Sequence, residues 1–167
     1  MSDLKFIEDA FAARQRPATV RDSAQPSDEI SADADAFAGV DWRDVTCAAL
    51  DKHSDAIFGF SPAAFCYFLP GIYSAGIREE RPDLLVNQGL VMMLDRGNAP
   101  ASWDIFFKER WPQLTVLECE ATQRWILWLE GFDPMPIADV SLSRAYDTVQ
   151  ILAHQGGATP LAAWPRK

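Results

Sequence analysis

Residues 61–72 read Ser-Pro-Ala-Ala-Phe-Cys-Tyr-Phe-Leu-Pro-Gly-Ile. Ser61 and Pro62 are typical of a helix start, because a serine side chain can accept a hydrogen bond from a free backbone N–H and proline needs no N–H at the first helical position. Large apolar side chains follow at the spacing of one helix face: Phe65, Phe68, Leu69 and Ile72. The stretch therefore predicts the most apolar helix of the chain.

Pro70 lies inside this predicted helix. A proline there removes one backbone hydrogen bond and clashes with the preceding turn, at a cost of about 3 kcal/mol. We therefore expect the helix either to kink near residues 66–69 or to break and restart, and Gly71 makes a break easier. A kink in an aromatic-rich helix can shape a pocket, for which the candidate lining residues are Phe65, Tyr67, Tyr73 and Trp125.

Helical patterns continue on both sides of this stretch. Thr115 and Glu118 form a capping-box pattern before an apolar series that stops at Gly131. The other patterns lie in residues 3–14, after the capping residue Asp41, in residues 82–94, after Ser102, and from Ser141 to Gly156. No stretch alternates in the manner of a strand between hairpin turns. We predict an all-α, single-domain bundle of about seven helices, one of them kinked at Pro70.

The chain divides into four segments by composition. Residues 1–16 are expected to hold an N-terminal helix, and residues 17–31, rich in Pro, Ser, Asp and Gln, a loop or linker. Residues 32–157 are expected to form the helical core domain, and residues 158–167 a C-terminal tail.

The overall charge limits the classes of partner. The 167 residues include 24 acidic and 15 basic side chains, which gives a net charge of −9. This balance argues against nucleic acid and against an anionic membrane surface as partners. No run of about 18 apolar residues is present, and Glu8 and Asp9 interrupt any signal-peptide pattern. Three cysteines, too few and too scattered for a disulfide framework, are typical of buried thiols in a reducing compartment. We therefore predict a cytoplasmic protein.

Residues 27–55, which we call the acidic stretch, contain eight acidic residues against Arg43 and Lys52, a net charge of −6. Such a stretch is either a solvated face or a surface that steers a basic partner. The candidate partner-binding residues are Asp33, Asp35, Asp41, Asp44, Asp51 and Asp55.

The sequence contains no strong motif for catalysis, metal binding or phosphate binding. The two histidines, His53 and His154, stand in no metal-binding motif, and no nucleophile motif is present. Gly156 and Gly157 follow a helix instead of preceding one, so they do not form a phosphate loop. We predict no catalytic residue, no metal and no cofactor. The six tryptophans are interpreted as core residues or, where exposed, as interface residues.

Residues 42–71 resemble a family of small bacterial proteins of unknown function. The resemblance rests on Trp42 and on the box formed by Phe65, Tyr67, Phe68, Leu69 and Pro70. In that family an aromatic-aromatic-Leu-Pro-Ala box follows a helix that contains a tryptophan, and Gly71 stands here where the family usually has alanine. The resemblance implies a bacterial, helical protein and assigns no activity or functional residue.

Three functional hypotheses follow. The leading one is a non-enzymatic protein that binds a protein partner, such as an immunity or inhibitor protein that neutralises a basic toxin through the acidic residues. The second is a small-molecule-binding protein or enzyme with a pocket at the Pro70 kink. The third is a homodimeric structural subunit that uses a tryptophan-rich face.

Overall fold

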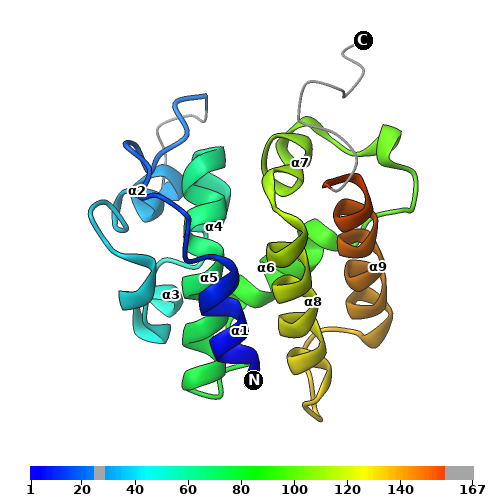
Figure 1. Cartoon of the computed structure of the whole chain (residues 1–167). Helices are drawn as coiled ribbons and strands as arrows, with labels where there is room; N and C mark the ends of the chain where they lie inside the picture. Colours follow the sequence, from blue (N-terminus) through cyan, green and yellow to red (C-terminus); the bar gives the residue numbers. More distant parts are fainter. Residues whose placement is uncertain (25–28, 157–167) are drawn as a thin grey trace.

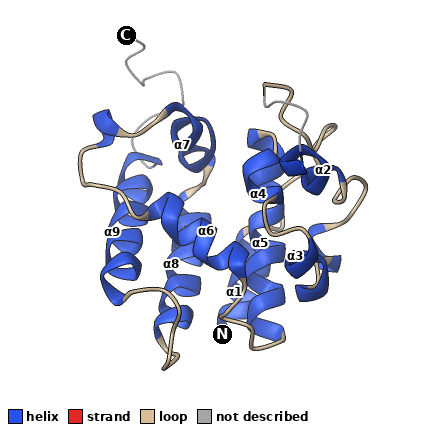
Figure 2. Ribbon diagram, turned by 180° about the vertical axis from the view of Figure 1, so that it is seen from behind, coloured by secondary structure: helices blue, strands red, loops and turns tan. Residues whose placement is uncertain are grey.

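Helices form almost all of the regular structure (Figures 1 and 2). The computed structural model describes residues 1–24 and 29–156. Within these residues there are nine α-helices, three 3-10 helices and one isolated β-bridge, between Arg21 and Phe60, but no strand. The all-α prediction is confirmed. The expected number of about seven helices is too low, because the short helices α2 and α4 were not predicted.

The bounds of the elements, in chain order, are as follows. The α-helices are α1 Asp3–Ala10, α2 Glu29–Asp35, α3 Cys47–Lys52, α4 Ala56–Gly59, α5 Pro62–Arg78, α6 Leu85–Leu94, α7 Ile105–Arg110, α8 Val116–Glu130 and α9 Asp139–Gly156. The 3-10 helices are η1 Trp42–Asp44, η2 Pro100–Ser102 and η3 Trp111–Gln113.

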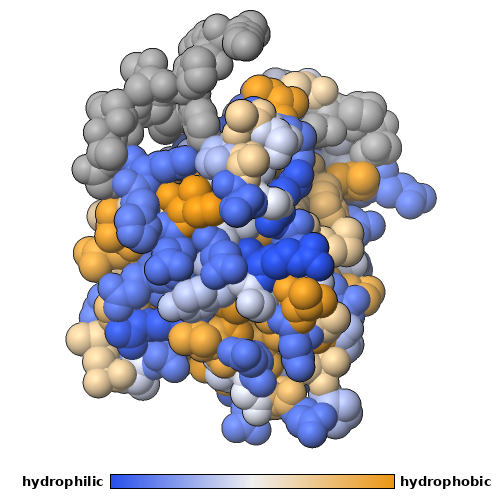
Figure 3. Space-filling view, turned by 90° about the vertical axis from the view of Figure 1, so that its right-hand side faces the viewer, coloured by the Kyte–Doolittle hydropathy of each residue, from blue (hydrophilic) through white to orange (hydrophobic). Residues whose placement is uncertain are grey.

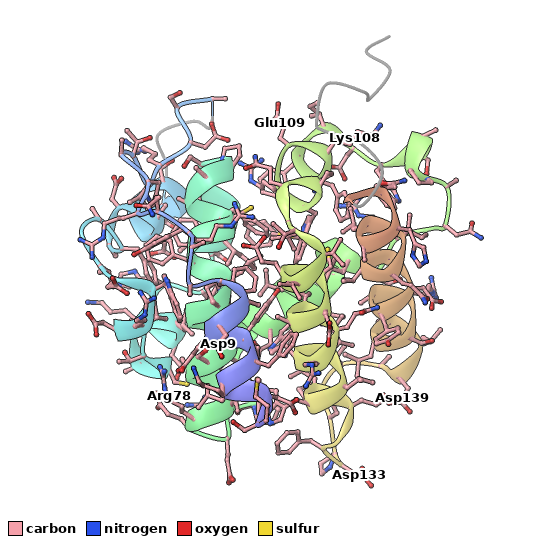
Figure 4. All side chains as sticks on the ribbon, viewed as in Figure 1. Asp9, Arg78, Lys108, Glu109, Asp133 and Asp139 are labelled. Carbon is pink, nitrogen blue, oxygen red and sulfur yellow. The ribbon has the colours of Figure 1, made fainter. Side chains whose placement is uncertain are left out.

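The helices form two neighbouring groups (Figure 1). Helices α2 to α5 lie on one side, and α6 to α9 lie on the other. Helix α1 contacts both α5 and α8, so the N-terminal helix joins the two groups. Side chains of α5 and α8 fill the space between the groups (Figure 4).

Helix α5 begins as its sequence predicts. The backbone N–H of Ala64 donates to the Ser61 hydroxyl oxygen at 3.2 Å, and Pro62 occupies the first helical turn. The helix then runs through Pro70 as far as Arg78 and is buried from Ala64 to Gly76. Of the two outcomes expected at Pro70, the break and restart does not occur, and a kink within the continuous helix stays a prediction.

Gly71 allows the backbone of η1 to lie directly against α5. A Cβ atom at Gly71 would stand 2.4 Å from the carbonyl oxygen of Trp42 and 2.9 Å from a methyl carbon of Val45. Side chains cannot be accommodated at such distances without a shift of the backbone. Glycine at this position is thus required by packing, and the family pattern with alanine does not fit this arrangement.

The capping box on α8 is confirmed. The Thr115 hydroxyl accepts from the backbone N–H of Glu118 at 3.3 Å, and the Glu118 carboxylate accepts from the N–H of Thr115 at 2.7 Å. Gly131 is the C-terminal cap of this helix, as expected.

Other predicted helix starts are shifted. Asp41 does cap a helix, but only the 3-10 helix η1. Val45, which follows η1, is extended, and Thr46 is the N-cap of a separate helix, α3. Asp104, not Ser102, caps α7. Helix α6 begins at Leu85 instead of Pro82, and α9 at Asp139 instead of Ser141.

Residues 11–24, which we call the N-terminal strap, connect α1 to the region before α2. They pair with the chain before α5: the N–H of Ser61 donates to the carbonyl of Val20 at 2.8 Å, and the N–H of Asp22 donates to the carbonyl of Gly59 at 2.9 Å. Helix α1 ends at Ala10, earlier than the expected residue 16, and α2 begins at Glu29, inside the segment expected to be loop. The predicted tail, 158–167, lies outside the described residues.

Most described tryptophans belong to the core. Trp42, Trp103, Trp111 and Trp125 are buried, and Trp128 is partly buried against the core. Figure 3, which views the molecule from the side of α9, shows hydrophobic side chains separated by hydrophilic ones. The described part of the chain therefore has no exposed tryptophan-rich face of the kind expected for a homodimer.

Candidate functional site

Three of the six candidate aspartates form ion pairs with arginines, and a fourth contacts a histidine. Asp33 lies 2.9 Å from the Nδ1 atom of His53. The other three pair with arginines: Asp35 with Arg21 at 3.8 Å, Asp41 with Arg16 at 3.4 Å and with Arg43 at 3.3 Å, and Asp51 with Arg81 at 3.2 Å. Arginines therefore neutralise three of the eight acidic residues of the acidic stretch.

The remaining two, Asp44 and Asp55, are exposed and make no ion pair with another described residue. Asp55 precedes α4 but its side chain makes no capping hydrogen bond. The structure therefore does not gather the six carboxylates into one unpaired acidic surface.

The four aromatic residues predicted to line a pocket at Pro70 are part of the packed core. Phe65, Tyr67, Tyr73 and Trp125 are at most 2% exposed. Tyr73 stacks on Trp125 with ring centres 4.5 Å apart, and Phe65 meets Trp111 edge-on at 5.1 Å. Burial raises the pKa of Tyr73 well above its usual range. These contacts join α5 to α8 and to η3.

Two pockets lie away from Pro70 in the part of the chain that the structure describes. The first, which we call the strap pocket, has a volume of about 320 Å³ and lies between residues 16–21 of the N-terminal strap and residues 35–40 that follow α2. Phe68 of α5 also lines it. The second, which we call the α6 groove, has a volume of about 280 Å³ and lies between α4, α6 and α7, with Phe58, Met92 and Phe106 in its lining. Figure 2 shows α6 between α4 and α7 on this side of the molecule.

The strap is anchored at one end by Arg14. Its guanidinium donates to both carboxylate oxygens of Glu118, at 2.6 and 2.7 Å, and to the carbonyl of Gln113 at 2.7 Å. Burial by itself lowers the pKa of Arg14. The hydrogen bond to the Glu118 carboxylate raises it, and overall the pKa lies above the usual value of an arginine. Glu118 is only 3% exposed. One carboxylate thus caps α8 and holds the strap.

The other end is anchored by Arg110, whose side chain is 1% exposed. Its guanidinium donates to the Asp22 carboxylate at 2.7 Å and to the carbonyls of Phe60 at 2.9 Å and Phe106 at 3.2 Å. The guanidinium carbon also lies 3.6 Å from the ring centre of Phe106. Sequence reasoning missed this pair, because its members are 88 residues apart and no local pattern marks either.

The three thiols lack the features of nucleophiles. Burial raises the pKa of Cys47 to about 11 and those of Cys66 and Cys119 to about 12. For Cys47, the neighbouring Glu79 carboxylate raises the pKa further. Reactive cysteines instead have lowered pKa values and partial exposure.

We expect the native protein to react very slowly with the thiol reagent DTNB. At pH 8 a thiol with a pKa of about 11 is thiolate in only about one molecule in a thousand, and burial further limits access. The measurement is the absorbance of released thionitrobenzoate over the first minutes. The same protein unfolded in guanidinium chloride is the control, in which all three thiols should react. Rapid labelling of Cys47 in the folded protein would contradict the assignment.

In residues 1–24 and 29–156, no three His, Cys, Asp or Glu side chains gather closely enough to hold a metal ion. Over the same residues, no helix combines the length and apolar composition that crossing a membrane would take.

Comparisons of the chain with protein-family models, with curated proteins and with solved structures found no match.

Proposed function

We propose that the protein acts by binding a protein partner, without chemistry of its own, and that the α6 groove is the contact surface. The observation that carries this proposal is the set of large apolar side chains left exposed around the groove. Leu85 and Met92 on α6 are 63% and 70% exposed, and Ile105 at the start of α7 is 71% exposed. Leu85, Gly89 and Met92 follow one another at i, i+4 and i+7, so they share one face of α6.

The lining of the groove suits an apolar side chain of a partner. Phe58, Met93 and Phe106 form apolar walls, and Gly89 lets the side chain of Ile57 pack closely against α6. The two charged lining residues, Arg96 and Asp104, pair with each other. Because the opposite charges of Arg96 and Asp104 cancel, the burial of apolar surface dominates the contact between the groove and a partner. Flexible methionines at such a surface adapt well to a partner.

The negative net charge of the chain favours a basic partner. The chain carries −9, so the long-range field attracts cationic proteins and repels a second copy of the same chain. The exposed Asp44 and Asp55 contribute to this steering, whereas the paired aspartates contribute little. An immunity or inhibitor protein that neutralises a basic toxin is the specific role that we propose within this class.

Met92→Glu is expected to weaken partner binding about tenfold or more, because it places a charge at the centre of an apolar contact. Met92 is exposed, so the fold should tolerate the change. We would capture proteins from the native lysate with the tagged wild type, with Met92→Glu and with Leu127→Glu. The third is a matched control, since Leu127 is 51% exposed on α8 and does not line the groove.

The experiment is then repeated with the purified partner, by titration calorimetry at about 50 mM and about 200 mM salt. The proposal expects one stoichiometric partner, loss of affinity for Met92→Glu alone, and weaker binding at higher salt. Equal affinity of wild type and Met92→Glu would exclude the groove. Binding that disappears only when Asp44 and Asp55 are reversed to lysine would move the contact to the acidic stretch.

The homodimer hypothesis predicts a different result in sedimentation. A second copy seated on the α6 groove would give a mass that rises with protein concentration and returns to the monomer in Met92→Glu. We expect a monomer at all concentrations, because two copies of charge −9 repel each other.

A further inference from the structure

The strap pocket has the dimensions and lining of a small-molecule site. Its volume of about 320 Å³ lies at the lower end of the range of about 300–1,000 Å³ for such sites. Phe37 and Phe68, which are 3% and 1% exposed, present apolar surface to it. Val20 and Val40 add apolar surface on opposite sides. This lining fits an aromatic or aliphatic group.

The wall contributed by the strap is held in place before any ligand binds. Residues 16–21, which form it, lie between the Arg14–Glu118 pair and the Asp22–Arg110 pair. Ser61 also holds this segment, because its N–H donates to the carbonyl of Val20 and its hydroxyl donates to the carbonyl of Thr19. A preformed wall lowers the entropy that a ligand loses when it binds.

Arg16 supplies a positive charge at this pocket. Its side chain is 49% exposed and donates to the Asp41 carboxylate at 3.4 Å. A hydrogen bond to the Tyr67 hydroxyl raises the pKa of Arg16, and Asp41 raises it further. A guanidinium has five N–H donors, so these two partners leave donors for an acceptor in the pocket.

Asp41 does not depend on Arg16 for charge balance. Its carboxylate also accepts from the backbone N–H of Arg43 at 3.0 Å and from the Arg43 guanidinium at 3.3 Å. Two arginines therefore share one carboxylate, which leaves one surplus positive charge beside the pocket. The Arg43 guanidinium is held over the Trp42 ring at 4.2 Å and does not line the pocket. Arg21 does line the pocket and pairs with Asp35 at 3.8 Å. Arg16 is therefore the lining arginine whose carboxylate partner is shared with a second arginine, and we assign ligand recognition to it.

We propose that the strap pocket binds a small molecule with an apolar body and a carboxylate group, and that Arg16 recognises the carboxylate. The apolar body lies against Phe37, Phe68 and the two valines. The carboxylate takes the place of Asp41 at Arg16, while Asp41 keeps its contacts with Arg43. This site is separate from the α6 groove and does not depend on the proposed partner.

The test uses three probes that share a phenyl ring and differ in charge: phenylacetate, the neutral 2-phenylethanol and the cationic 2-phenylethylamine. Each is titrated into the full chain labelled with ¹⁵N, and the amide shifts of Ala38 and Gly39, both in the pocket lining, report binding. We expect saturable binding of phenylacetate, and weaker binding of the alcohol and of the amine. Arg16→Gln should weaken phenylacetate binding about tenfold or more.

Arg144→Gln is the matched control, because Arg144 is an exposed arginine that pairs with Asp95 at 3.4 Å and does not line the pocket. It should leave the affinity for phenylacetate unchanged within about twofold. Ala38→Trp, which fills the pocket from an exposed turn, should abolish binding of all three probes. Thermal unfolding of each variant verifies that the fold is kept.

Three results would overturn the proposal. The first is the absence of saturable binding of phenylacetate to the wild type at millimolar concentration. The second is tighter binding of the amine, which would assign recognition to Asp35 and Asp41. The third is an equal loss of affinity in Arg16→Gln and Arg144→Gln, which would show that only the general positive charge matters.

Discussion

Asp22→Asn is expected to lower the free energy of unfolding by about 3–5 kcal/mol. Asparagine keeps the shape of the side chain but removes the carboxylate charge that Asp22 places 2.7 Å from the buried guanidinium of Arg110. The guanidinium remains hydrogen-bonded to the carbonyls of Phe60 and Phe106, but these are neutral groups. The exposed Glu109 lies 3.8 Å away and is too solvated to compensate.

The measurement is urea unfolding followed by tryptophan fluorescence and by circular dichroism. Glu120→Gln is the matched control, because Glu120 pairs with Arg124 at 3.0 Å on the surface, with 46% and 34% of the two side chains exposed. Loss of such a pair should cost less than about 1 kcal/mol. Equal effects of the two substitutions would mean that water reaches Arg110.

A double-mutant cycle separates the charge pair from the loss of side-chain packing. Arg110→Met removes the buried charge and keeps much of the apolar stem. The double variant Asp22→Asn/Arg110→Met should be more stable than Asp22→Asn alone, since it leaves no unpaired charge in the interior. Strict additivity of the two single effects would contradict a direct ion pair.

The features that could be predicted from the sequence depend on neighbours along the chain. Ser61 before Pro62 marks the start of α5, and Thr115 with Glu118 marks the start of α8, because a cap uses residues within one turn. Helix α2 was missed for a physical reason: its buried residues, Ser31 and Ala34, are small and leave no stripe of large apolar side chains. Helix α4 has four residues, too few for apolar side chains to recur at helical spacing.

The candidate sites depend on distant neighbours, which one sequence does not show. The count of −6 in the acidic stretch omitted Arg16, Arg21 and Arg81, which approach it from outside and pair with three of its aspartates. Likewise, the strap pocket exists only because residues 16–21 are anchored to α7 and α8, through contacts that span 88 and 104 residues. Arginines and acidic residues that lie so far apart in the sequence gave no sign that they would meet.

Gly71→Ala is expected to lower the free energy of unfolding by about 1–3 kcal/mol. Two effects oppose each other here. Alanine in the middle of a helix is favoured over glycine by about 1 kcal/mol. The new methyl carbon, however, would stand 2.4 Å from the carbonyl oxygen of Trp42, and a backbone atom cannot rotate away as a side chain can. The steric effect should therefore exceed the gain in helix propensity.

Gly76→Ala on the same helix provides the matched control. A Cβ atom there would meet its nearest neighbours, a carbonyl of Arg81 and the ring of Trp128, at an ordinary 3.6 Å. We expect this variant to be more stable than the wild type by about 0.5–1 kcal/mol, so the two glycines of α5 should respond with opposite signs in urea unfolding. Similar stabilisation of both would show that η1 can move away from α5. In that case a chain with alanine at this position could adopt the same fold.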